Sequence, residues 1–134
     1  MAFKIKLKDL IEQLEAVIVD RGEHYQYPKT YTCFYGGPDE APDSKDRCIY
    51  GEALARLGWK YDPRIEKAGI RVRLTERKLI ELEDKVYEHP DAAELLRLIV
   101  TVQSMQDAGD AYGTSVKDAV NTLKKRATEM GLLS

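Results

Sequence analysis

Two amides and a carboxylate follow one another on a segment whose other residues are typical of a buried helix. Gln103, Gln106 and Asp107 stand near the end of the stretch LLRLIVTVQSMQDAGDAYG, at spacings i, i+3 and i+4. Positions with this spacing are neighbours on one side of a helix. A buried amide or carboxylate without partners is costly, so these groups need hydrogen bonds. The cluster is therefore either a structural hydrogen-bond network or the wall of a pocket for a small polar ligand.

Aromatic side chains form a second group that could bind a partner. Tyr25 and Tyr27 lie in EHYQYPKTYTCFYGG, where aromatic and β-branched residues alternate on either side of a proline, and Tyr112 follows the polar cluster. The alternation predicts a small β-hairpin. Tyrosines are common at protein-binding surfaces, and the same residues also suit a hairpin face packed on helices. Both interpretations are open for this group.

A thiol is the third reactive group. Cys48 stands in the first turns of a predicted helix, where the helix dipole can lower a thiol pKa, although a lone cysteine is more often a small buried hydrophobe. Catalysis needs a nucleophile and a base with an orienting partner, and the two histidines lie outside any such motif. The spacings of cysteine and histidine are not those of a zinc site. We therefore expect no metal and no cofactor, and an enzyme that uses Cys48 or Asp107 is the weaker alternative to a non-enzymatic role.

The elements that must position these residues follow from hydrophobic periodicity. Apolar residues at helical spacing predict helices at about Lys8–Asp20, Asp46–Gly58, Thr75–Tyr87, Pro90–Ala108 and Thr114–Met130. Phe3, Ile5 and Leu7 alternate with lysines, which predicts a short strand or a lead-in to the first helix. The expected fold is mainly α, in the α+β sense, with four to five helices in a bundle and a small β-hairpin.

Bulk composition limits the class of protein. The chain has 134 residues, which predicts a single globular domain over residues 1–134, and its 43% hydrophobic and 33% charged residues supply a core and a solvated surface. A net charge of -2 gives no general attraction to nucleic acid or to an anionic membrane. No apolar run approaches the roughly 18 residues that span a bilayer. The first ten residues lack the apolar core of a secretory signal, so we expect a cytoplasmic protein.

Three motifs together resemble a set of small proteins from actinobacteria and their phages. The first is a Y-x-Y segment after the leading helix; the second is a helix with the pattern C-x-x-G-x-x-L-x-x-L-G; the third is a helix end with the pattern Q-x-x-Q-D-x-G-x-x-W/Y-G. The matching residues are Tyr25 and Tyr27; Cys48, Gly51, Leu54, Leu57 and Gly58; and Gln103, Gln106, Asp107, Gly109, Tyr112 and Gly113. The resemblance implies a phage or prophage accessory protein, and it implies no reaction and no catalytic residues.

The first functional hypothesis is therefore a non-enzymatic accessory protein that binds a host protein and can form a homodimer. The alternative is a protein that binds a small, nucleotide-like ligand in a pocket. The polar cluster and the tyrosines would line that pocket. The residues expected to contact a ligand or partner are Tyr25, Tyr27, Cys48, Gln103, Gln106, Asp107 and Tyr112.

Overall fold

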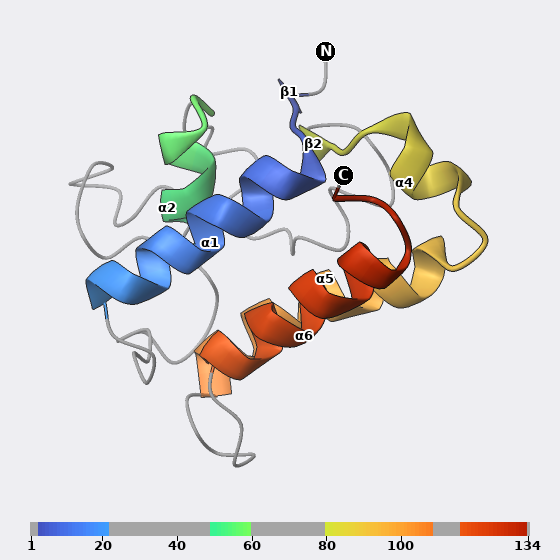
Figure 1. The fold of residues 1–134 in the computed structure, drawn as a ribbon. Helices are drawn as coiled ribbons and strands as arrows, with labels where there is room; N and C mark the ends of the chain where they lie inside the picture. The colour runs from blue at the N-terminus through green and yellow to red at the C-terminus, as the bar shows by residue number, and fades with distance from the viewer. Residues whose placement is uncertain (1–2, 22–48, 60–79, 109–115, 134) are drawn as a thin grey trace.

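In the part of the chain that the structure describes, the fold is an assembly of helices with one very short sheet (Figure 1). A computed structural model of the chain describes residues 3–21, 49–59, 80–108 and 116–133. Helix accounts for 74% of these residues, in five segments, beside one two-stranded sheet. The prediction of a mainly helical protein with a small β element is therefore confirmed. The hairpin predicted around Tyr25 and Tyr27 lies outside the described residues.

Helix α1 spans Leu7–Arg21 and has helices on two sides. Its buried positions recur every three or four residues, so one stripe of the helix faces the core. These residues are Leu7, Leu10, Ile11, Leu14, Val17 and Ile18, all at most 6% exposed. Helix α2 (Ile49–Arg56) packs on one side of α1 and α6 lies along another side (Figure 1). The helix predicted at Lys8–Asp20 is confirmed, with ends that differ by one residue.

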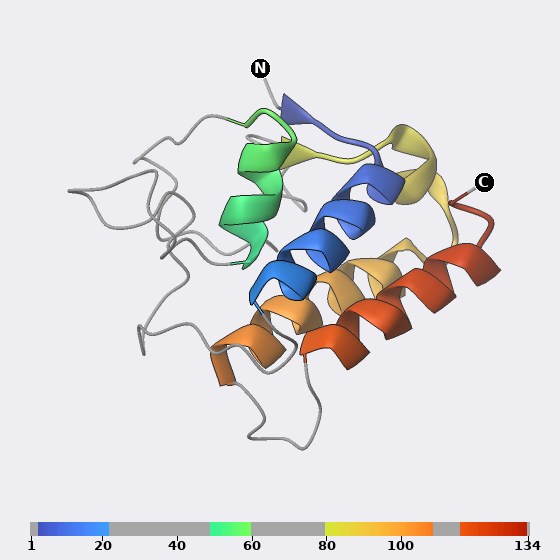
Figure 2. The same ribbon diagram turned by 60° about the vertical axis from the view of Figure 1, so that its left-hand side comes forward.

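Helices α5 and α6 form an antiparallel pair beneath α1 (Figure 2). Helix α5 spans Ala92–Ala108 and α6 spans Val116–Glu129. Their facing stripes are fully or nearly fully buried, and they consist of Leu95, Ile99, Val102, Val120, Leu123 and Ala127. The helices predicted at Pro90–Ala108 and Thr114–Met130 are confirmed within the described residues.

Two of these helices end in the same glycine-dependent turn. At the end of α2, the Gly58 N–H donates to the Ala55 carbonyl at 3.0 Å and the Trp59 N–H donates to the Leu54 carbonyl at 2.9 Å. This is the Schellman arrangement, which places the glycine in the left-handed region, and Gly58 has a φ of 102°. Gly131 closes α6 through the equivalent pair of bonds, with a φ of 73°. The prediction that Gly58 ends the second helix is confirmed.

We expect Gly58→Ala to lower the free energy of unfolding by about 1–2 kcal/mol, because an L residue is strained at this φ. A Cβ at this position would meet no atom within 4 Å, so the loss is conformational rather than steric. Urea denaturation of the parent and of Gly58→Ala measures this loss of unfolding free energy. Ala93→Gly, in an exposed position of α5, makes the opposite exchange at a helical φ, and we expect it to cost about 1 kcal/mol, because glycine is unfavourable in a helix. A Gly58→Ala protein as stable as the parent would contradict the assigned backbone conformation.

A short strand occupies the first described residues of the helix predicted at Thr75–Tyr87. Strand β1 (Phe3–Lys4) pairs in parallel with β2 (Ile80–Glu81), in the register Phe3↔Ile80 and Lys4↔Glu81. In the described part of the predicted range, only α4 (Asp84–Glu88) is helical, so a single helix there is wrong. Ile80 and Leu82 are completely buried and Glu81 between them is half-buried, which is the period of two typical of a strand. The predicted strand or lead-in at Phe3 is confirmed as a strand.

One side-chain hydrogen bond joins the segment after β2 to the start of α1, and a second joins that segment to α4. The Leu7 N–H, in the first turn of α1, donates to Glu83 Oε1 at 3.2 Å. The Leu82 N–H donates to the Tyr87 hydroxyl at 3.1 Å. The first N–H groups of a helix have no partner within the helix, so Glu83 supplies one from a distant part of the chain. This contact fixes the position at which α1 begins.

Candidate functional site

A groove runs between α1 and the C-terminal half of α6, with a volume of about 390 Å³. In Figure 1 and Figure 2 the two helices lie side by side and run in opposite directions. The groove residues from α1 are Lys8, Ile11, Glu12 and Glu15. The groove residues from α6 and the turn after it are Lys124, Thr128, Gly131 and Leu133. The start of α1, held by Glu83, is therefore at the same end of the groove as the turn that closes α6.

The floor of the groove is apolar. Ile11 lies at the bottom and is 1% exposed. Leu133 is half-buried and packs against the hydrophobic core. Gly131 has no side chain, so the wall at that point consists of backbone. A partner side chain placed in the groove would therefore meet hydrocarbon below and backbone on one side.

Among the described residues, the rim of the groove carries two cations and two carboxylates. Lys124 Nζ lies 3.2 Å from Glu15 Oε2, and this ion pair crosses from α6 to α1. Lys8 Nζ lies 4.0 Å from Glu12 Oε1, one turn further along α1. Exposed ion pairs of this kind contribute only about 0–1 kcal/mol each. The rim charges can therefore exchange their partners at low cost when another charged surface approaches.

Two arginine clusters hold the helices that form the groove. Arg126 of α6 donates from Nε to Glu94 Oε2 at 2.7 Å, and its Nη2 lies 3.2 Å from Asp91 Oδ2, at the start of α5. The hydrogen bond to Glu94 is the main cause that raises the pKa of Arg126 above its ordinary value. The cluster joins α6 to α5 on the side of the molecule where α5 begins.

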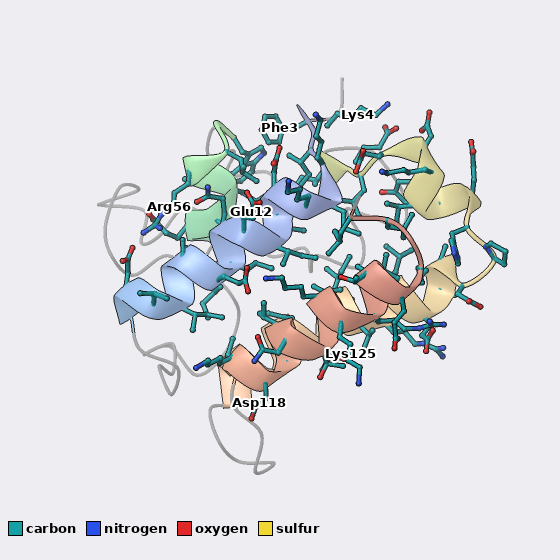
Figure 3. All side chains as sticks on the ribbon, in the orientation of Figure 1. Phe3, Lys4, Glu12, Arg56, Asp118 and Lys125 are labelled. Atoms are coloured by element: carbon teal, nitrogen blue, oxygen red, sulfur yellow. The ribbon has the colours of Figure 1, made fainter. Side chains whose placement is uncertain are left out.

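The second arginine cluster joins α2 to α1. Arg56 hydrogen-bonds to Asp20 of α1 and to Glu52 of its own helix, the latter at 3.0 Å. The hydrogen bond to Asp20 is the main cause that raises the pKa of Arg56, followed by the bond to Glu52. Figure 3 shows Arg56 on α2, which lies on a different side of α1 from α6. Contacts on both of its sides therefore fix the position of α1.

None of the residues predicted from the sequence is among the described residues that line this groove. Gln103, Gln106 and Asp107 belong to the last turns of α5, where the structure describes the backbone and not the side chains. Tyr25, Tyr27, Cys48 and Tyr112 lie outside the described residues. The pocket for a small polar ligand therefore stays a prediction.

Sequence reasoning missed the groove residues because each has an ordinary explanation by itself. Ile11 belongs to the apolar stripe of α1. Lys8, Glu12 and Glu15 are what any exposed helix face carries, and Lys124 matches the dipole near the end of α6. What marks the groove is that the charged residues of α1 lie opposite Lys124 of α6. That match is visible only once the two helices are known to be neighbours.

The described residues hold no candidate metal site and no membrane-spanning helix. Among residues 3–21, 49–59, 80–108 and 116–133, no three His, Cys, Asp or Glu side chains gather in a way that could hold a metal ion. In the same part of the chain, every helix is too short or too polar to cross a membrane. Comparisons with protein-family models, with curated proteins and with solved structures gave no match.

Proposed function

We propose that this protein acts by binding another protein through the α1–α6 groove, as a non-enzymatic accessory protein of phage or prophage type whose partner is a host protein. The observation that carries the proposal is the apolar floor beneath a rim with charges of both signs. An apolar centre with a polar, solvent-accessible rim is the usual arrangement of a protein–protein interface.

The energetics of the groove favour a peptide segment as the bound group. Full burial of a leucine-sized side chain contributes about 1.5–3 kcal/mol, and the half-buried Leu133 offers apolar contact for one such side chain. The rim can then exchange its weak ion pairs for pairs with charges on the partner. These charges select the partner and its orientation more than they add affinity.

The helices that form the groove are anchored in the core, which lowers the cost of binding. The two helices that form its walls pack into the core through residues that are at most 1% exposed. These include Leu10 and Leu14 of α1 and Val120 and Leu123 of α6. A surface that is already in its bound shape loses little conformational entropy on association. The partner therefore has to order only its own segment.

Site-specific photo-crosslinking tests the proposal. Two variants each carry one photoreactive phenylalanine. In the first it replaces Thr128, which is exposed at the groove, and in the second it replaces Lys125. Figure 3 shows Lys125 on the side of α6 that is turned away from α1. We expect a host protein to be captured at position 128 about tenfold more than at position 125, and excess unmodified protein to compete with the capture.

Binding by the purified captured protein completes the test. We expect Leu133→Glu to weaken its affinity at least about tenfold, because a charge would enter the apolar floor, while Lys125→Glu leaves the affinity within about twofold. Equal capture at positions 128 and 125, or equal binding by the two variants, would overturn the groove as the interface.

A further inference from the structure

We propose that, in the free protein, a second copy of this chain occupies the groove, with the two α1 helices antiparallel about a two-fold axis. The inference rests on the proposed function only in its use of the same groove. It requires no host protein.

The inference starts from two opposite charges on one face of α1. Lys8 and Glu15 both line the groove, and their side chains are 64% and 34% exposed. They are seven residues apart, which is about two helical turns or roughly 10 Å along the axis. Ile11 and Glu12 lie between them. Ile11 is 1% exposed and belongs to the core, so the accessible face has a positive end at Lys8 and a negative part at Glu12 and Glu15.

A two-fold axis makes this pattern complementary to itself. An isologous interface requires that one patch binds the same patch of the other subunit. With the axis between Ile11 and Glu12, Lys8 faces Glu15 of the second copy and Glu15 faces Lys8 of the second copy. One placement thus creates two ion pairs between subunits. A parallel placement would set Lys8 against Lys8 and Glu15 against Glu15, so the charges specify the antiparallel arrangement.

The other groove charges are compatible with this dimer. The described lining holds two lysines, Lys8 and Lys124, and two glutamates, Glu12 and Glu15, so its formal charge is zero. The two Glu12 side chains lie beside the axis, and each keeps Lys8 of its own chain, 4.0 Å away, as a counter-charge. Glu15 keeps Lys124 as its partner within the chain, since a carboxylate has about four acceptor positions and can serve two amines. Because exposed charge pairs contribute little, we expect a dissociation constant on the order of 100 µM.

Sedimentation equilibrium at low salt tests the dimer with charge reversals. We expect Lys8→Glu and Glu15→Lys each to weaken dimerisation about tenfold, because each variant places like charges together at both pairs. An equimolar mixture of the two variants restores the parent affinity in a heterodimer. The double variant, with both changes in one chain, restores the homodimer. Far-UV circular dichroism confirms that each protein is folded.

The controls separate this inference from a general charge effect and from the proposed function. Lys125→Glu, a charge reversal on the far side of α6, should dimerise like the parent. Added salt should weaken the parent dimer, because it screens exposed pairs. A parent protein that is monomeric at about 1 mM, ten times the expected dissociation constant, would overturn the inference, as would a mixture no more dimeric than either variant alone. Either result leaves host capture at position 128 as an independent measurement.

Discussion

Leu14→Ala is expected to lower the free energy of unfolding by about 3 kcal/mol, within the range of roughly 2–5 kcal/mol for buried leucines. Leu14 is 0% exposed and lies in the middle of α1, which packs against both α2 and α6. Removal of its side chain loses apolar burial and leaves a cavity between helices that are fixed by other contacts. Urea denaturation followed by far-UV circular dichroism measures the loss.

Val19→Ala is the matched control for this change. Val19 is on the same helix but is 81% exposed. Its truncation should alter the free energy of unfolding by no more than about 0.5 kcal/mol. Similar losses in the two variants would mean that the stripe of α1 assigned to the core is not its buried face.

Ile80→Ala should cost about 2–4 kcal/mol, because the side chain of the first β2 residue is also 0% exposed. Ile80 is opposite Phe3 in the parallel pair, and the next hydrogen bond, from the Ile5 N–H to the Glu81 carbonyl, is 2.9 Å long. The substitution would therefore disturb the pairing of β1 with β2 as well as remove buried area.

A graded series shows whether burial is the cause. Ile80→Val should lose about 0.5–1.5 kcal/mol, between the parent and Ile80→Ala, because it removes a single methylene group. Glu81→Ala, at the half-buried neighbouring position, should change stability much less. A negligible effect of Ile80→Ala would contradict the buried strand and would favour the helix predicted from periodicity.

The long helices could be predicted because their local signals agree with their packing. In α1, α5 and α6 the apolar residues recur at helical spacing over three or more turns, and that spacing is also what the core requires. The Thr75–Tyr87 prediction was wrong because Leu79, Leu82 and Val86 fit a helix while Ile80 and Leu82 fit a strand. The segment forms a strand because Ile80–Glu81 pairs with Phe3–Lys4, which is far away in the chain. A local pattern contains no information about that partner.

The groove could not be predicted for a related reason. Polar residues in an apolar helix, such as Gln103 and Gln106, can be recognised from the sequence as unusual, because a buried amide needs hydrogen-bond partners. The groove residues break no such rule, since Lys8 and Glu12 are exposed charges on an amphipathic helix. Their significance depends on α6 lying beside α1. The Lys124–Glu15 contact joins residues 109 positions apart, which no periodicity within a helix can reveal.

The pairing of α1 with α6 has a consequence for how the molecule folds. Helices α5 and α6 are consecutive in the described chain and can meet after closing a short loop, whereas α1 must close a loop of about a hundred residues to reach α6, at a larger entropic cost. Non-local contacts of this kind raise contact order and slow the folding rate. We expect the α5–α6 pair to form early and α1 to dock late. The binding surface would then exist only in the completed fold, so no partly folded species could engage a partner through it.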